Sequence, residues 1–220
     1  MKNYIKNSKI LKKNHVYSEE MEHDACGVGL IASTEGKKSR KVVEYGIEAL
    51  KAVWHRGAVD ADGKTGDGAG IHVEIPKDFF IEKIEVTGHN HDNSEICVGM
   101  IFLPRNDYAA QENCKTIVES ELTKNDFSIY GWRQVPVNPK VLGEKAFQTM
   151  PEIIQVLFKS NNPDLLNKDL ERKIYETRRI IENKAFQISL NNFYICSLSS
   201  KSIIYKGMFL ACLLYTSPSP

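Results

Sequence analysis

Cys26 is the residue whose type and neighbours most clearly suit chemistry. It stands between Ala25 and the run 27–29 (GVG). If the chain were cut before Cys26, one residue would carry both a thiol and a free α-amine. The α-amine has an ordinary pKa of about 7.7–8.0 and can act as a general base, while the thiolate is a strong nucleophile. The alternative is a small buried residue in a strand, because free cysteine is among the most buried residue types.

Arg56 is the second candidate, within the run 55–57 (HRG). An arginine at a helix end, beside a glycine turn, can present its planar fork to a cleft and bind a substrate α-carboxylate through two parallel hydrogen bonds. The alternative is a solvated side chain that only complements the negative end of the helix dipole.

A glycine- and aspartate-rich loop occupies residues 60–70 (DADGKTGDGAG). It superficially resembles a phosphate-binding loop, but Gly57 precedes Gly63 by one residue too many and the segment follows a predicted helix. Nucleotide binding is therefore disfavoured. We expect Gly66, Asp67 and Gly68 to shape a site, because glycine lets the backbone pass close to the Cys26 segment or to a small ligand.

A metal site at 89–92 (HNHD) is also disfavoured, because a polar turn of this composition needs no metal. The five cysteines are odd in number and widely spaced, which argues against a disulfide framework or a structural zinc. The net charge of +1 creates no field that favours nucleic acid. The lysine-rich start is followed by polar and acidic residues rather than an apolar stretch, so we expect a cytoplasmic protein with a polar leader.

The remaining pattern predicts a layered α/β domain, in which helices cover sheets. Ser39 should cap a helix that reaches Trp54. We expect the last nine residues, 212–220, to be either a non-native tail or a disordered terminus. Further helices are expected at 107–122 and 170–185, and strands at 25–32, 71–75, 96–103, 127–137 and 153–158, with a strand pair at 193–198 and 202–205 around a polar turn.

Several of these segments, in this order, resemble the glutaminase portion of the glutamate synthase large subunit. The similarity rests on 24–32 (DACGVGLIA), 55–70 (HRGAVDADGKTGDGAG), 131–139 (GWRQVPVNP), 142–144 (LGE) and 193–208 (FYICSLSSKSIIYKGM). It covers nearly everything from about Glu20 to Ala211.

The resemblance implies a class II glutamine amidotransferase with the N-terminal-nucleophile hydrolase fold, a four-layer α/β/β/α sandwich of antiparallel sheets that would be incomplete here at its C-terminus. By the same likeness, residues 1–25 form a propeptide and residues 26–211 form a partial domain. Cys26 becomes the catalytic nucleophile, which attacks the side-chain amide of L-glutamine to form a thioester. Arg56 matches the family residue assigned to the α-carboxylate of glutamine.

In the full-length family enzyme the released ammonia converts 2-oxoglutarate to glutamate. The resemblance implies that FMN and a 3Fe-4S cluster serve that step and that no cofactor binds within these 220 residues. The other domains of the same chain are the expected partners, with a small NADPH-oxidising subunit or ferredoxin as electron donor. Purine or amino-sugar class II amidotransferases are the nearest alternative, and a nucleotide-binding module is a remote one.

One departure from the family pattern generates a prediction. The family's oxyanion hole uses an HNGE segment beyond the run 205–208 (YKGM), and no such segment follows in this sequence. Loss of one oxyanion donor typically lowers turnover by about 10²–10³. We therefore expect the isolated 220-residue chain to be inactive or nearly so. A glutaminase assay that gave the rate of an intact domain would refute this.

Overall fold

A computed structural model describes residues 6–7, 9–10, 27–53, 57–92, 94–190 and 192–211. The described helices are α2 (Arg40–Ala52), α3 (Lys77–Val86), α4 (Tyr108–Lys124), the 3-10 turn η2 (Pro139–Val141), α5 (Glu144–Gln148) and α6 (Asn167–Gln187). The described strands are β1 (Ala69–Glu74), β2 (Cys97–Leu103), β3 (Phe127–Gln134), β4 (Glu152–Ser160), β5 (Tyr194–Ser199) and β6 (Ser202–Gly207).

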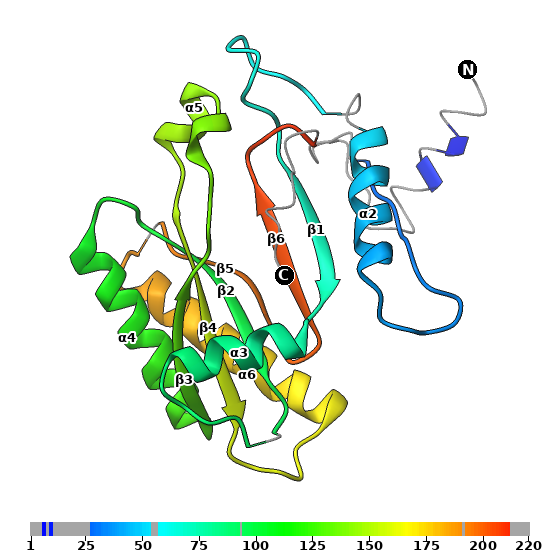
Figure 1. Cartoon of the computed structure of the whole chain (residues 1–220). Coiled ribbons are helices and arrows are strands. Elements are labelled where there is room, and N and C mark those ends of the chain that lie inside the picture. The colour runs from blue at the N-terminus through cyan, green and yellow to red at the C-terminus, as the bar shows by residue number, and fades with distance from the viewer. Residues whose placement is uncertain are drawn as a thin grey trace.

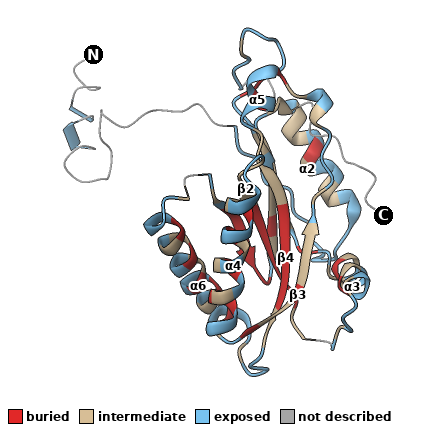
Figure 2. Cartoon of the chain, turned by 90° about the vertical axis from the view of Figure 1, so that its left-hand side faces the viewer, coloured by how far each residue is buried: buried red, intermediate tan, exposed pale blue. Residues whose placement is uncertain are grey.

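Four of these strands form an antiparallel sheet in the order β3-β4-β2-β5. Side chains of β2 alternate between its faces, as expected for a strand buried on both sides. Cys97 and Ile101 join the apolar core beneath α4 and α6, whereas Val98 and Met100 join a second core on the opposite face. Figure 2 shows the buried residues gathered along the central strands and the inner sides of these two helices.

The second core lies between this sheet and a two-stranded antiparallel sheet of β1 and β6. Ile203 of β6 and Phe80 of α3 are fully buried within it. Helix α2 lies beside β1 (Figure 1), where the Cβ position of Gly46 is 3.6 Å from Ile71 Cδ1. The chain is thus a mixed α/β structure with antiparallel sheets, as the sequence predicted.

The predicted helix starts at Ser39 and Asp107 are confirmed. Ser39 Oγ accepts a hydrogen bond from the backbone N–H of Lys41 at 3.2 Å, and Asp107 Oδ1 accepts one from Ala110 at 2.9 Å. Both caps satisfy N–H groups that have no partner within their helix. Helix α2 ends at Ala52, and the predicted end at residues 54–56 lies outside the described residues.

The predicted buried strand at 25–32 is wrong over its described part. Residues 27–33 form no strand, and the side chains of Val28 and Leu30 are 92% and 89% exposed. An apolar run becomes a buried strand only if another element pairs with it and covers it. No described strand pairs with this segment.

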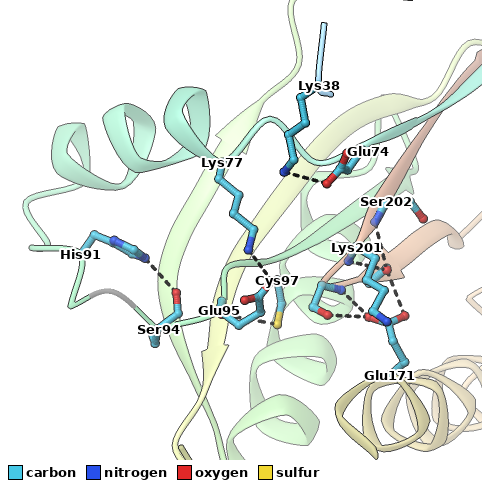
Figure 3. A network of polar contacts seen from close by, with 12 residues as sticks. Lys38, Glu74, Lys77, His91, Ser94, Glu95, Cys97, Glu171, Lys201 and Ser202 are labelled. Atoms are coloured by element: carbon cyan, nitrogen blue, oxygen red, sulfur yellow. Dashed lines mark hydrogen bonds and ion pairs between the residues drawn. The ribbon is translucent and has the colours of Figure 1, made fainter. Parts of the chain in front are cut away.

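The predicted pairing of the last two strands is also wrong, although both strands exist. Strand β5 pairs with β2, and β6 pairs with β1. Glu171 of α6 holds the connection between them, because its carboxylate accepts hydrogen bonds from Ser199 Oγ at 3.0 Å and from the Ser200 backbone N–H at 2.7 Å (Figure 3). The connection therefore turns into a different sheet instead of closing a hairpin.

Helix α3 was not predicted from the sequence. The sequence features that would predict this helix are weak. Pro76 precedes it without any side-chain cap, and only Phe80 and Ile84 are fully buried. Those two residues are four apart and so lie on one helical face. Nearby, Lys77 pairs with Glu95 at 2.6 Å, which ties the start of α3 to the start of β2 (Figure 3).

The core beneath α4 and α6 generates a stability prediction. Phe158 is fully buried and packs edge-on against Phe127 with ring centroids 5.4 Å apart. Phe158→Ala should lower the free energy of unfolding by about 3–5 kcal/mol, because it removes apolar contacts and leaves a cavity. Phe186→Ala is the matched control, since Phe186 is 83% exposed and its loss should change that energy by less than about 1 kcal/mol. Urea denaturation of both variants measures the difference, and equal losses would contradict the assigned core.

Candidate functional site

The two principal candidates, Cys26 and Arg56, lie outside the described residues. Their immediate neighbours do not. Gly27, which follows Cys26, and Gly57, which follows Arg56, both line one large open cavity of about 3270 Å³. Gly66, Asp67 and Gly68 line the same cavity. The third predicted feature and the described neighbours of the other two thus border the same wide hollow, which residues from most of the described elements also line.

Residues 57–68 form a short hairpin-like loop. Val59 and Gly66 make an antiparallel bridge. Asp67 closes the base of the loop, because its Oδ2 accepts a hydrogen bond from the Ala58 backbone N–H at 2.9 Å and its own N–H reaches the Ala58 carbonyl at 3.4 Å. Asp67 thus fixes the backbone two residues after Arg56, which gives this predicted residue a structural task at the cavity wall.

Asp62 organises the tip of the same loop. Its carboxylate accepts hydrogen bonds from Thr65 Oγ1 at 2.5 Å and from the backbone N–H groups of Thr65 and Lys64 at 2.7 and 2.9 Å. These bonds, that of the Thr65 side chain above all, lower the pKa of Asp62 to about 2. Asp62 is consequently ionised across the neutral range and acts only as an acceptor.

Helix α5 supports this loop from the β3–β4 connection. Gly143 lies so close to the loop that a Cβ atom there would collide with Asp62 Oδ2 and Thr65 Oγ1, and would lie 2.6 Å from the Thr65 nitrogen. Lys145 pairs with Asp60 at 2.6 Å. Gly143 and Lys145 were not predicted as site residues. The available signal for Gly143 was the run 142–144 (LGE), one of the segments on which the family resemblance rests.

The glycines at the end of the loop pass close to β6 and the residues after it. A Cβ on Gly66 would lie 2.9 Å from Leu210 Cδ2, and one on Gly70 would lie 2.7 Å from the Tyr205 carbonyl oxygen. Gly68 has a φ of +111°, a conformation that favours glycine, and its Cβ position is 3.2 Å from the Gly207 oxygen. The backbone thus does pass close to another segment, but the expected approach to the Cys26 segment or to a small ligand stays a prediction. Among the described residues the close approach is made to β6 and to residues 207–210, while Cys26 lies outside them.

The run 89–92 is a hydrogen-bonded surface turn. His91 Nε2 lies 3.0 Å from the Ser94 carbonyl oxygen, and His89 Nδ1 lies 3.1 Å from Thr87 Oγ1. An ion pair with Lys159 holds the pKa of Asp92 well below its usual range. Across the described part of the chain, no three His, Cys, Asp or Glu side chains gather in a way that could hold a metal ion.

Three of the five cysteines are described, and all three are buried free thiols. Burial raises the pKa of Cys97 and Cys196, and raises that of Cys114 to about 11. A buried thiol with a raised pKa supplies little thiolate at neutral pH and is a poor nucleophile.

Comparison with known proteins places the chain in a family. Residues 26–216 match the model of the class-II glutamine amidotransferases, and the chain belongs to that family.

In the described ranges, no helix has the length and apolar character that crossing a bilayer requires.

Within this family, the chain is similar in sequence to a group of curated glutamate synthases. The chain is 54% identical over 210 residues to the NADPH glutamate synthase large chain of Azospirillum brasilense, covering 96% of this chain and 14% of that relative. It is 38% identical over 215 residues to the ferredoxin-dependent glutamate synthase of Pyropia yezoensis, covering 94% of this chain and 13% of the relative. It is 39% identical over 202 residues to ferredoxin-dependent glutamate synthase 2 of Arabidopsis thaliana, covering 90% and 12%. The chain thus spans only a small part of the length of these relatives.

The contact between α5 and the loop generates a prediction. Gly143→Ala should displace residues 60–65, because the new methyl group would overlap Asp62 and the Thr65 backbone. Trypsin should then cleave after Lys64 about tenfold faster, since proteolysis follows the population of the opened loop. Gly46→Ala is the matched control, because its Cβ would make an ordinary 3.6 Å contact with Ile71 Cδ1. Mass spectrometry of timed digests measures the cleavage, and equal rates in the two variants would argue against the support by α5.

Proposed function

We propose that this chain is the glutaminase part of a glutamate synthase, which hydrolyses L-glutamine to L-glutamate and ammonia. The observation that carries the proposal is the 54% identity to a glutamate synthase large chain over 96% of this chain. Membership of the class-II glutamine amidotransferases supports the same reaction. The cavity bordered by Gly27, Gly57 and the loop glycines offers room for a small amino acid.

Cys26 is the proposed nucleophile, as the N-terminal residue of the mature chain after removal of residues 1–25. Two observations support this assignment. The family match begins at residue 26. The described cysteines 97, 114 and 196 are all buried with raised pKa values, so none of them suits nucleophilic attack.

The proposed reaction is acyl transfer through a thioester. The thiol proton of Cys26 passes to its own α-amine, and the sulfur attacks the amide carbon of the glutamine side chain. The carbon–nitrogen bond breaks, and ammonia leaves with the proton that the α-amine returns. Water then attacks the thioester, glutamate is released, and the thiol is restored. Arg56 is proposed to hold the α-carboxylate of glutamine through its two parallel N–H groups.

The rest of the proposal concerns the longer protein of which the relatives are examples. FMN and a 3Fe-4S cluster would serve the conversion of 2-oxoglutarate to glutamate in the other domains of that protein. The relatives' names include both NADPH and ferredoxin as electron donors. A small NADPH-oxidising subunit or ferredoxin would accordingly be the redox partner. The complete domain would be a four-layer α/β/β/α sandwich. Helices α4 and α6 would form one outer layer, the two facing sheets the middle layers, and α2 part of the other outer layer.

Mutation of Cys26 tests the proposal directly. In the full-length protein, Cys26→Ala should abolish glutaminase turnover, because the sulfur atom that attacks the amide carbon is lost. N-terminal sequencing of the active protein should begin at Cys26, and a glutamine-like electrophile should label that residue alone. Cys114→Ala, in the core beneath α4, is the control and should keep the turnover number within about twofold.

The same assay tests Arg56. Arg56→Lys should raise the KM for glutamine about tenfold with a smaller effect on kcat, because a lysine cannot form the bidentate contact.

Normal turnover by Cys26→Ala, or an active protein that still carries residues 1–25, would overturn the proposal.

A further inference from the structure

Gln155 is a polar side chain on a central strand of the four-stranded sheet, and it is completely buried. It lies on β4 between Ile154 and Val156, which both belong to the core beneath α4 and α6, so its side chain faces the space between the two sheets. A guanidinium has only donors, so Arg133 Nη1 of β3 donates to Gln155 Oε1 at 2.8 Å. The Gln155 amide nitrogen then faces Tyr205 of β6 and donates to its hydroxyl oxygen at 3.3 Å.

Both partners of Gln155 keep donors that they do not use. Arg133 stacks over the ring of Phe79 at 5.1 Å from the centroid, and no carboxylate in the described ranges forms an ion pair with it. Burial raises the pKa of Tyr205, so its hydroxyl keeps its proton at neutral pH. That proton has no acceptor in the part of the chain that the structure describes. A partly buried cation with no anion beside it is unfavourable until a counter-charge reaches it.

Apolar side chains lie around these donors without closing over them. Phe102, Val135, Ile153 and Ile204 pack against the core between the sheets, yet they are only partly buried and line the large cavity. The core is therefore open toward the cavity that Arg133 also lines. An apolar surface that contains one unpaired cation is complementary to a polypeptide segment that brings apolar side chains and a carboxylate.

We propose that this open side of the core is a docking surface for a segment of the longer protein outside residues 1–220, and that an Asp or Glu side chain of that segment pairs with Arg133 and accepts the Tyr205 hydroxyl. The inference rests on the proposed function, because only the longer protein supplies such a segment. The chain covers 14% of its relative from Azospirillum brasilense, so most of a protein of that kind lies outside these residues. Free glutamine does not fit, since its one α-carboxylate is assigned to Arg56.

A zero-length cross-link in the full-length protein tests the contact. Arg133→Lys keeps the positive charge and introduces an amine, which a water-soluble carbodiimide joins to a carboxylate that touches it. The introduced amine should be joined to an Asp or Glu outside residues 1–220, identified by tandem mass spectrometry of the digested protein. Lys145 and Asp60, which pair at 2.6 Å, are the internal control, because the same reagent should join them in the same sample.

Arg179→Lys is the matched control variant. Arg179 lies on α6 and pairs with Glu182, so the amine introduced there should be joined to Glu182. No cross-link at position 133, or one only to residues 1–220 of the same chain, would overturn the docking surface if Lys145 and Asp60 are joined. A mixture of heavy-isotope-labelled and unlabelled protein identifies the donor of the carboxylate. A link between a labelled and an unlabelled chain would show that a second copy occupies the surface, and this would also overturn the proposal.

Hydrogen exchange provides a second test, which does not depend on the folding of Arg133→Lys. In the full-length protein, Arg133→Met should raise amide exchange in a peptide outside residues 1–220 by about 10–100-fold, because the docked carboxylate loses its partner. Tyr205→Phe should raise it there by about 3–10-fold, through loss of one hydrogen bond. Arg179→Met should not change it. Exchange that rises only within residues 1–220 in both variants would overturn the docking surface.

These outcomes are separable from a failure of the proposed function. The function fails if Cys26→Ala leaves glutaminase turnover intact, whatever is joined to position 133. The docking surface fails if the cross-link and the exchange effects outside residues 1–220 are both missing, whatever the turnover.

Discussion

The antiparallel pairing of β1 with β6 is the interaction on which the arrangement of the cavity depends. It joins residues 69–74 to residues 202–207, more than a hundred positions later in the sequence. The glycines before and within β1 make the approach possible, because a side chain at Gly70 would overlap the Tyr205 carbonyl and Lys206. Without this pairing, the loop at 57–68 and the segment at 207–211 would not be held beside the same cavity.

The two apolar cores have different consequences for that space. The core beneath α4 and α6 consists mainly of apolar side chains and cysteines, beside the buried polar residues Gln111, Glu121 and Thr177 of the two helices, and it fixes the central sheet as a rigid base. The core between the sheets is open along one side to the cavity and carries Gln155 at full burial. A polar group in such a place restricts which partners can lie beside it, since each must satisfy the amide. Arg133 of β3 donates to the Gln155 amide oxygen at 2.8 Å, and the Gln155 amide nitrogen donates to the Tyr205 hydroxyl at 3.3 Å, so both partners meet that requirement.

The sequence predicted those parts of the fold that depend on local pattern. The helix caps at Ser39 and Asp107, the amphipathic α6 and the apolar strand β2 could all be predicted from spacing. The pairing of β5 and β6 could not, because Glu171 holds their connection from about thirty residues earlier. Residues 27–32 are exposed because no described strand pairs with them, and no local pattern contains that information. For the candidate site, the role of Gly66, Asp67 and Gly68 stays a prediction, although all three line the cavity. Gly143 could not be predicted, because a close contact between distant loops leaves no periodic signal.

These observations separate two tasks that a glutamine-hydrolysing site requires. The proposed chemistry needs only one residue, in which sulfur and amine are joined by the covalent geometry of Cys26 itself. Holding a small, flexible, charged substrate needs groups from several elements whose positions are fixed beforehand. Asp67 with Ala58 fixes one part of the cavity wall. Asp62, with Gly143 packed against it, fixes the tip of the same loop. In both, an aspartate side chain accepts hydrogen bonds from backbone N–H groups and so fixes the course of the loop.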